Sequence, residues 1–367
     1  MKLLFVLEHY YPHVGGGETL FKLLTEKLVS EGHECHVVTC RLKGTKKFEK
    51  INGVHVHRVN VPHWKDRYWF TFFAIPTVLR LARKCDIIHT MTYNGALPAR
   101  FASKLLEKPS VITVHEVLGD LWVNARIMTG PVGMVHRFFE EIIIFLNFSR
   151  FVAVSEYTKK SLVREGVSAS KVSVVYNGVD YNFFDPKKVR KKALKRKEFT
   201  YLYFGRTGVV KGPEYLIKAV PKIRDMIPGS KLILITNLKE GRGKYIQSII
   251  DDLDVKDSII NVSQVPRKEL PSYLMSADCV VIPSLSEGFG FNAAEACALG
   301  IPVVATRAGA LPEVVSGKYI FIRPKNPEDI ANAVLSVKNG KYRKTKLKKF
   351  TLEDFYKGYK EVYDSMI

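Results

Sequence analysis

Short apolar runs alternate along the chain with longer segments in which apolar residues recur at helical spacing. In the first half of the chain the apolar runs predict strands at residues 3–7, 35–39, 54–59, 86–90, 111–114, 151–154 and 172–175. Segments such as Glu18–Ser30 and Phe101–Glu107 lie between these runs and have the spacing of amphipathic helices. This alternation is typical of βαβ units, which build a parallel sheet with helices on both faces.

The pattern pauses at Asp185–Pro186 and a Lys/Arg-rich run, and then restarts. Strands are predicted at residues 200–204, 231–236, 258–262, 279–282 and 302–305, and helices at 214–227, 245–253, 268–275 and 292–299. A chain of 367 residues has room for two domains. The sequence therefore predicts an α/β protein with two tandem, doubly wound, Rossmann-like domains at 1–184 and 185–347. Residues 348–367 form a last helix with one apolar face that needs a partner.

Two further segments, residues 64–81 and 134–148, are rich in aromatic and apolar residues. Each is too short and too charged to span a bilayer. They are either core helices or a surface that faces a membrane or an acceptor. The first apolar run, Leu3–Leu7, is too short for a signal peptide. We therefore expect a cytoplasmic protein, with peripheral attachment to the inner face of the cell membrane as a further hypothesis.

The chain carries 57 Lys and Arg against 36 Asp and Glu, a net charge of +21. This excess favours binding to phosphates of nucleotides, nucleic acid or an anionic membrane, although solvated faces and linkers explain single basic clusters equally well. The sequence has no helix-turn-helix, RRM or zinc-finger pattern, which disfavours a nucleic-acid-binding protein. The cysteines are odd in number and lack zinc-ligand spacing, so we interpret them as buried thiols: Cys35, Cys40, Cys85, Cys279 and Cys297.

The segment Pro283–Ala296 is the strongest candidate for chemistry, because it follows an apolar strand and opens a helix. At such a turn the first helical N–H groups are unpaired, and Gly288 and Gly290 let a phosphate approach the backbone. Glu287 and Glu295 flank this turn with seven residues between them and can bracket one ligand. The alternative for Glu295 is a capping box with Asn292 as the cap.

The segment Tyr203–Gly212 runs from another strand end to another helix start. It carries two cations, Arg206 and Lys211, which together suit a diphosphate leaving group. Its position, after the first strand of the second domain, is where doubly wound folds bind ligands.

The N-terminal half offers weaker signals. A glycine triplet, Gly15–Gly17, lies between the first strand and the first helix, and it serves either as a hinge or as a place of close ligand approach. His115 ends the strand at 111–114, where it faces a cleft or has a structural role. The acidic triplet Asp252–Asp254 is best explained as a solvated helix end, so no metal site is expected.

With these motifs together, nearly the whole chain resembles the family 4 retaining glycosyltransferases of the GT-B fold. Glu287 and Glu295 resemble the family's E-x7-E motif, and Gly205–Gly212 is similar to its diphosphate-binding segment. Val152–Glu156 and Tyr176–Asp180 resemble its interdomain stretch, and Gly15–Gly17 its N-terminal donor-facing loop.

The resemblance implies a role for each matching residue. Arg206 and Lys211 would hold the diphosphate, Glu295 the ribose hydroxyls, and Glu287 and His115 the transferred sugar. Val265 would contact the base, and the last helix would cross back to the N-terminal domain. The catalytic set is Glu287, His115, Arg206 and Lys211; the donor-binding set is Gly15, Gly16, Gly17, Arg206, Lys211, Val265, Glu287, Gly288, Phe289, Gly290, Phe291, Asn292 and Glu295.

The expected activity is transfer of a sugar from a UDP- or GDP-sugar to an acceptor, with retention of anomeric configuration and without metal or other cofactor. The acceptor is either lipid-linked or a polysaccharide, an anionic membrane is a candidate partner, and nucleic acid is not expected. The alternatives are a nucleotide-sugar epimerase or a sugar phosphorylase of the same fold, and, more remotely, a nucleic-acid-binding protein.

Overall fold

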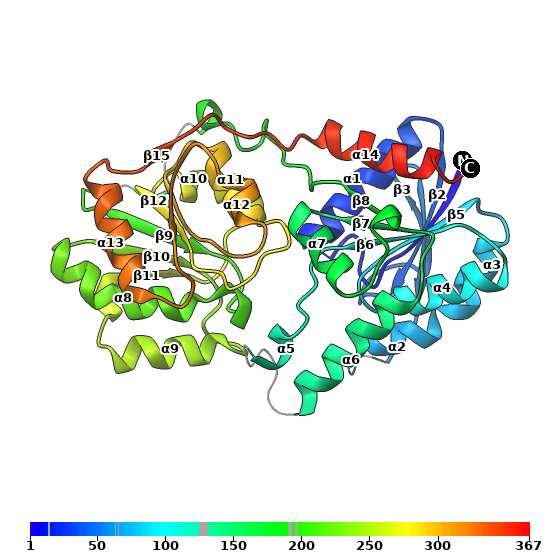
Figure 1. Cartoon of the computed structure of the whole chain (residues 1–367), viewed down its shortest axis with the longest axis horizontal. Coiled ribbons are helices and arrows are strands. Elements are labelled where there is room, and N and C mark those ends of the chain that lie inside the picture. The colour runs from blue at the N-terminus through cyan, green and yellow to red at the C-terminus, as the bar shows by residue number, and fades with distance from the viewer. Residues whose placement is uncertain (14, 63, 65, 125–130, 190–192, 195–196) are drawn as a thin grey trace. The chain divides into compact units, whose positions relative to one another are not determined.

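Two parallel-dominated sheets, each covered by helices, form the two halves of the computed structural model (Figure 1). The structure describes residues 1–13, 15–62, 64, 66–124, 131–189, 193–194 and 197–367. Unit 1 contains Met1–Gly119, Met134–Gly178 and Leu352–Ile367, and unit 2 contains Asp120–Gly133 and Val179–Thr351. The α/β fold class is as the sequence predicts, but the chain passes into unit 2 at Val179 rather than at residue 185, and residues 120–133 group with unit 2. Part of the predicted Lys/Arg linker run, residues 190–192 and 195–196, lies outside the described residues.

The sheet of unit 1 has the strand order β3-β4-β2-β1-β5-β6-β7-β8, and every neighbouring pair is parallel except β3 with β4. Its strands are β1 (Lys2–Val6), β2 (Glu34–Cys40), β3 (Phe48–Ile51), β4 (Val54–Val59), β5 (Ile87–Met91), β6 (Ser110–Val114), β7 (Arg150–Ala153) and β8 (Val172–Val174). Its helices are α1 (Gly16–Ser30), α2 (Asp66–Phe73), α3 (Ile75–Ala82), α4 (Ala96–Leu105), α6 (Pro131–Phe145), α7 (Glu156–Arg164) and α14 (Leu352–Asp364). The short helix α5 (Leu121–Asn124) falls in the segment that groups with unit 2.

The sheet of unit 2 has the order β11-β10-β9-β12-β13-β14-β15, with only the β14–β15 pair antiparallel. Its strands are β9 (Thr200–Phe204), β10 (Lys231–Ile235), β11 (Ile259–Val262), β12 (Cys279–Ile282), β13 (Val303–Thr306), β14 (Lys318–Ile322) and β15 (Arg343–Lys344). Its helices are α8 (Pro213–Met226), α9 (Gly243–Asp252), α10 (Leu270–Leu274), α11 (Phe291–Ala298), α12 (Leu311–Val314) and α13 (Pro327–Lys338).

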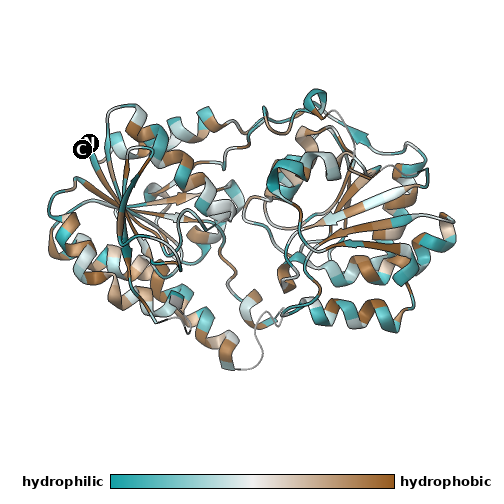
Figure 2. Ribbon diagram, turned by 180° about the vertical axis from the view of Figure 1, so that it is seen from behind, coloured by the Kyte–Doolittle hydropathy of each residue, from teal (hydrophilic) through white to brown (hydrophobic). Residues whose placement is uncertain are grey.

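Burial on both faces explains why most central strands are visible in the sequence. Every residue of β6, β9 and β12 is buried, and apolar or aromatic residues make up most of their sequences. The strands inside the two sheets are accordingly coloured mostly as hydrophobic in Figure 2. The edge strands β3 and β15 are partly or fully exposed, and their mixed sequences gave no strand signal. All five cysteines are buried and free, as predicted.

The strand order reverses once in each sheet, between β1 and β5 in unit 1 and between β9 and β12 in unit 2. At such a switch point the connections from neighbouring strands leave toward opposite faces of the sheet, and the loops at the carboxyl ends diverge around a ligand-sized space. The loops after β9 and β12 are Gly205–Gly212 and Pro283–Gly290, so both cation- and carboxylate-bearing motifs of the sequence lie at the switch point of unit 2.

The last helix, α14, packs within unit 1 although the preceding chain belongs to unit 2. Its buried stripe consists of Phe355, Tyr359, Val362 and Tyr363. The Tyr363 hydroxyl lies 2.6 Å from His89 Nδ1, and the Tyr359 hydroxyl lies 2.8 Å from Thr113 Oγ1. Both rings carry their polar atoms to partners inside the core, which fixes the helix on strands β5 and β6.

The two aromatic segments form α2, α3 and α6, and each has one face in the core of unit 1. One hydrophobic cluster buries Phe70, Val78, Ile143 and Ile144. The prediction that these segments form core helices is therefore confirmed for one face of the helices only. Other aromatic residues of the same helices are solvent-exposed. Among the described residues, no helix is long and apolar enough to cross a membrane.

Candidate functional site

The two motif-bearing loops of unit 2 are in direct contact. The backbone N–H of Leu285 donates to the carbonyl of Val210 at 2.7 Å. Gly212 has φ of +61°, and a Cβ at this position would lie 2.4 Å from the Pro283 carbonyl oxygen. Only glycine combines this left-handed conformation with so close a backbone approach. The contact therefore brings the segments 205–212 and 283–295 together at the carboxyl ends of strands β9 and β12.

An ion pair joins the two loops at their tips. Lys211 Nζ lies 2.8 Å from both Oε1 and Oε2 of Glu287. The Glu287 carboxylate is buried and also accepts a hydrogen bond of 2.8 Å from Ser284 Oγ. An ammonium group has three N–H donors, so Lys211 has donor capacity beyond its two contacts with Glu287.

Arg206, the second cation of the loop, is exposed, and among the described residues no ion pair holds its guanidinium. Its backbone is fixed instead, because the buried Tyr203 hydroxyl donates to the Arg206 carbonyl at 2.7 Å. The preceding Gly205 has φ of +142° and lies against the Asn292 amide. The structure thus anchors the turn and leaves the Arg206 side chain available to an anion.

Glu295 lies in the same helix that follows the second loop. Burial raises the pKa of Glu295 to about 7, although its ion pair with Arg267, 3.2 Å from Arg Nη2 to Oε1, lowers the pKa in part. The alternative interpretation as a capping box is wrong. Helix α11 begins at Phe291 with Gly290 as its N-cap, and Asn292 uses its side chain to donate to the Phe204 carbonyl.

The other donor-binding candidates of unit 2 occupy different environments. Gly290 adopts φ of +90° as the N-cap of α11, a conformation that favours glycine, and its predicted contact with the donor phosphate stays a prediction. Phe289 is buried, with its ring centroid 5.2 Å from that of Phe291. Val265 is half-buried in the loop after β11, two residues before the Arg267 that bonds Glu295. Val265 is therefore close in the chain to the residue that pairs with Glu295. Its predicted contact with the nucleotide base stays a prediction.

Two of the candidates of unit 1, Gly17 and His115, lie close together. Helix α1 begins at Gly16, and a Cβ on Gly17 would lie 3.1 Å from His115 Nε2. Glycine at this position lets the helix start approach the histidine ring. Burial lowers the pKa of His115 to about 4, so the imidazole is neutral at neutral pH. Its Nε2 is shielded from solvent and has no hydrogen-bond partner among the described residues.

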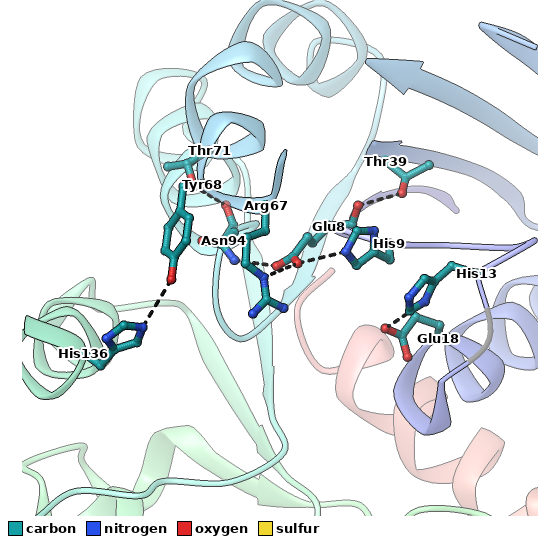
Figure 3. A network of polar contacts seen from close by, with 10 residues as sticks. All are labelled: Glu8, His9, His13, Glu18, Thr39, Arg67, Tyr68, Thr71, Asn94 and His136. Carbon is teal, nitrogen blue, oxygen red and sulfur yellow. Dashed lines mark hydrogen bonds and ion pairs between the residues drawn. The ribbon is translucent and has the colours of Figure 1, made fainter. Parts of the chain in front are cut away.

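A pocket at the switch point of unit 1 was not predicted from the sequence. It is lined by Glu8, His9, Glu18, Arg67, Met91, Thr92 and Tyr93. Glu8 follows β1 and is bonded by His9, Arg67 and Asn94 (Figure 3). Burial alone would raise the pKa of Glu8, but these hydrogen bonds and charges lower it to about 2. The position of Glu8 directly after the first strand was the available signal.

The two sites differ in chemistry. The site of unit 2 combines cations, backbone turns and carboxylates, which suits a phosphate ester that also carries hydroxyl groups. The pocket of unit 1 combines an ionised carboxylate with histidine and hydroxyl groups, which suits a hydroxyl-bearing ligand. Across the part of the chain that the structure describes, no group of three or more His, Cys, Asp or Glu side chains is arranged to hold a metal ion.

Comparison with known families gives two matches that divide the chain. Residues 14–183 match the model of glycosyltransferase family 4, and residues 184–353 match that of the glycosyl transferases group 1. An uncharacterized glycosyltransferase of Methanocaldococcus jannaschii is 30% identical over 351 residues, covering 90% of this chain and 87% of the relative. A phosphatidylinositol N-acetylglucosaminyltransferase component of Arabidopsis thaliana is 23% identical over 357 residues, or 91% of this chain and 73% of that protein.

Solved structures share the two-domain fold over the full chain. The Anabaena protein HepE in complex with UDP-glucose superposes with a TM-score of 0.74 at 19% identity, with both chains covered completely. The sucrose-phosphate synthase of Thermosynechococcus elongatus also gives 0.74, at 18% identity, covering 100% of this chain and 99% of that one. At this identity the likeness shows the GT-B architecture of two Rossmann-like domains.

The close approach of the two loops predicts a position-specific effect of adding one methyl group. We expect Gly212→Ala to destabilise unit 2 by about 2–5 kcal/mol, because left-handed strain and a clash with the Pro283 carbonyl add together. Gly229→Ala is the matched control, since Gly229 has φ of +78° but nothing within 4 Å of its Cβ position. It should cost only about 1–2 kcal/mol in urea unfolding. Equal costs for the two variants would contradict the contact.

Proposed function

Since the chain belongs to family 4 of the group 1 glycosyl transferases, and is therefore a glycosyltransferase, we propose that it uses a nucleotide-diphosphate sugar as donor and retains the anomeric configuration of the sugar. One observation carries the proposal. The loop with Arg206 and Lys211 touches the loop with Glu287, at the point where the strand order of unit 2 reverses. This contact supports a site in which the cations bind a diphosphate and the carboxylates accept hydrogen bonds from sugar hydroxyls.

The reaction needs this pairing because of where charge develops. Cleavage of the sugar–phosphate bond leaves negative charge on the departing diphosphate and positive charge on the sugar. Arg206 and a further N–H of Lys211 stabilise the diphosphate, aided by the positive end of the α11 dipole. Glu287 accepts hydrogen bonds from hydroxyls of the transferred sugar, and Glu295 accepts them from the ribose hydroxyls.

We propose that transfer proceeds without a metal ion. The two cations neutralise the leaving group in place of a divalent ion. Glu287 is already bonded to Lys211 and Ser284, which leaves it as a binding carboxylate rather than a free nucleophile, and we assign no covalent intermediate.

In unit 1, we assign His115 and the Gly15–Gly17 turn to the sugar end of the donor, following the family resemblance. The burial of His115 supports this role, because a neutral imidazole whose Nε2 has no partner among the described residues can form a hydrogen bond to a sugar hydroxyl without bringing in a second charge. The pocket around Glu8 is the proposed place of the acceptor hydroxyl.

We propose a lipid-linked acceptor in preference to a free polysaccharide. Helices α2 and α6 of unit 1, the unit proposed to bind the acceptor, expose aromatic side chains. The name of the Arabidopsis relative includes phosphatidylinositol. Both UDP- and GDP-sugars remain candidate donors.

Removal of Arg206 tests the donor site most directly. We expect Arg206→Ala to lower kcat/KM about 10²–10³-fold, because one preorganised charge on the leaving group is lost. The melting temperature should not change, since the Arg206 side chain is exposed. Lys218→Ala, which removes an exposed cation on α8, is the matched control and should retain full activity. Wild-type turnover by Arg206→Ala would refute the diphosphate role.

The same assay on Lys211→Ala should show a second effect. Activity falls as in Arg206→Ala, but stability falls too, by about 1–3 kcal/mol, because the buried Glu287 carboxylate loses its cation. A melting temperature equal to that of the wild-type protein would contradict the ion pair.

Product stereochemistry and metal dependence can be read from one reaction. Proton NMR of the fresh product should show the anomeric configuration of the donor. Turnover after exhaustive treatment with EDTA should equal turnover before it. An inverted product, or activity that EDTA removes and Mg²⁺ restores, would each overturn the corresponding part of the proposal.

The raised pKa of Glu295 predicts that the affinity for the donor depends on pH. Because the folded-state pKa of Glu295 is about 7, the group is largely protonated at about pH 6 and ionised at about pH 8. An ionised carboxylate is the better acceptor for ribose hydroxyls, so affinity for the nucleotide sugar should rise about fivefold across this interval. Isothermal titration calorimetry of wild type and Glu295→Gln measures the effect. The variant should show no such rise, and the same rise in both would assign it to another group.

A further inference from the structure

Helices α2 and α6 carry matching stripes of exposed apolar side chains. On α2 the exposed residues are Tyr68, Trp69, Phe72 and Phe73, and on α6 they are Met134, Val135, Phe138 and Phe139. Both sets have the spacing i, i+1, i+4, i+5, which places each on a single helix face. Phe72 and Phe138 are 63% and 60% exposed, far more than residues of a core helix. Soluble monomers seldom expose so many clustered large apolar side chains without an interaction that uses them.

The two helices form one surface. The Tyr68 hydroxyl lies 3.2 Å from His136 Nε2, so a hydrogen bond links the first residue of the α2 stripe to α6 (Figure 3). Their opposite faces share the core of unit 1 through Phe70, Ile143 and Ile144. The exposed stripes are thus held in place by the fold, and they are not loosely attached side chains.

The neighbouring helices α3 and α4 add positive charge and more apolar surface. Helix α4 exposes Phe101 and Leu105 together with Lys104. From Asp66 to Leu105 the sequence has six Lys or Arg residues against two acidic residues: Arg67, Arg80, Arg83, Lys84, Arg100 and Lys104 against Asp66 and Asp86. Helix α6 adds Arg137 against Glu140 and Glu141. This excess persists in the structure, where Arg80, Arg83 and Lys104 are exposed.

We infer that the exposed faces of α2, α4 and α6, with the basic residues of α3 and α4, dock on the surface of an anionic lipid bilayer. Aromatic side chains favour the headgroup region, where their rings leave water and their polar atoms stay hydrated. Lys and Arg nearby gain energy from the negative surface potential of anionic lipids. The inference rests on the proposed function in one respect: binding to the membrane would bring the enzyme to the proposed lipid-linked acceptor.

Charge favours a bilayer over a second copy of the chain as the occupant. An isologous dimer through this surface would place the same basic residues of both copies against each other. An anionic membrane satisfies the apolar and the basic parts of the surface at once.

Vesicle flotation of the full chain tests the inference. The wild-type protein should float with vesicles of phosphatidylcholine and phosphatidylglycerol and bind phosphatidylcholine alone much more weakly. Phe72→Ser/Phe138→Ser should lower the partition coefficient about tenfold or more, because two rings no longer leave water. Phe48→Ser is the matched control: Phe48 is 53% exposed on the edge strand β3, and the variant should bind as wild type does. Loss of binding in Phe48→Ser equal to that in the double variant would overturn the assignment of the surface.

The charged part of the surface is tested separately. Arg80→Gln/Lys104→Gln should lower binding to the anionic vesicles on the order of tenfold without changing binding to phosphatidylcholine. No flotation of the wild-type protein would refute the inference. If the wild-type protein does not bind vesicles but forms a concentration-dependent dimer in analytical ultracentrifugation, and the Phe72→Ser/Phe138→Ser variant abolishes that dimer, the inference is also refuted.

Donor binding distinguishes this inference from the proposed function. The stabilisation that a nucleotide sugar gives in a thermal shift assay should be the same in wild type and in both surface variants, because no mutated residue lies in unit 2. Vesicle binding without any response to nucleotide sugars would leave the surface assignment standing and refute the donor. The reverse result would refute the surface alone.

Discussion

The close packing of two loops at the switch point of unit 2 is the constraint on which the candidate donor site depends. Strands β9 and β12 are neighbours in the sheet, so the loops that follow them start side by side. Gly212 then allows its loop to touch the Pro283 carbonyl, and this contact sets Lys211 against Glu287. The positions of Arg206, on the same turn, and Glu295, in the helix after the second loop, follow from these two backbone paths.

Two buried glutamates show how the number of donors around a carboxylate decides its charge. Glu295 is paired with Arg267, but burial prevails, so its pKa rises to about 7. Glu8 is also buried, but His9, Arg67 and Asn94 surround it, and its pKa falls to about 2. The surroundings therefore raise the pKa of the glutamate in unit 2 and lower the pKa of the glutamate in unit 1. This difference fits a carboxylate that receives a ligand and one that organises a pocket.

In unit 1, the two faces of helices α2 and α6 lie in different environments. The inner faces of α2 and α6 belong to the core beside the sheet, and their outer faces present aromatic rings to solvent. The pocket around Glu8 lies at the carboxyl ends of β1 and β5, and Arg67 of α2 contributes to it. The helix that supplies exposed rings thus also supplies a cation to the pocket, so a surface that docks α2 on lipid would hold the pocket near that lipid.

The sequence by itself determined the fold class and most central strands, because strands buried on both faces consist mostly of apolar residues. It also determined the chemical character of Arg206, Lys211, Glu287 and Glu295. It did not reveal β3 or β15, whose exposed residues carry no apolar pattern, and strand β14 was not predicted either, although its sequence is largely apolar. Local patterns report burial, and they do not report which strands become neighbours.

Tertiary structure alone decided the contacts. It joined Glu295 to Arg267 instead of to a helix cap, set Gly17 against His115, and built the pocket of Glu8 from residues far apart in the chain. It also placed α14 in unit 1, where two tyrosine hydroxyls find partners on β5 and β6. Each of these contacts depends on strand order and on the path of the backbone between strands, which arise only when the whole chain is packed.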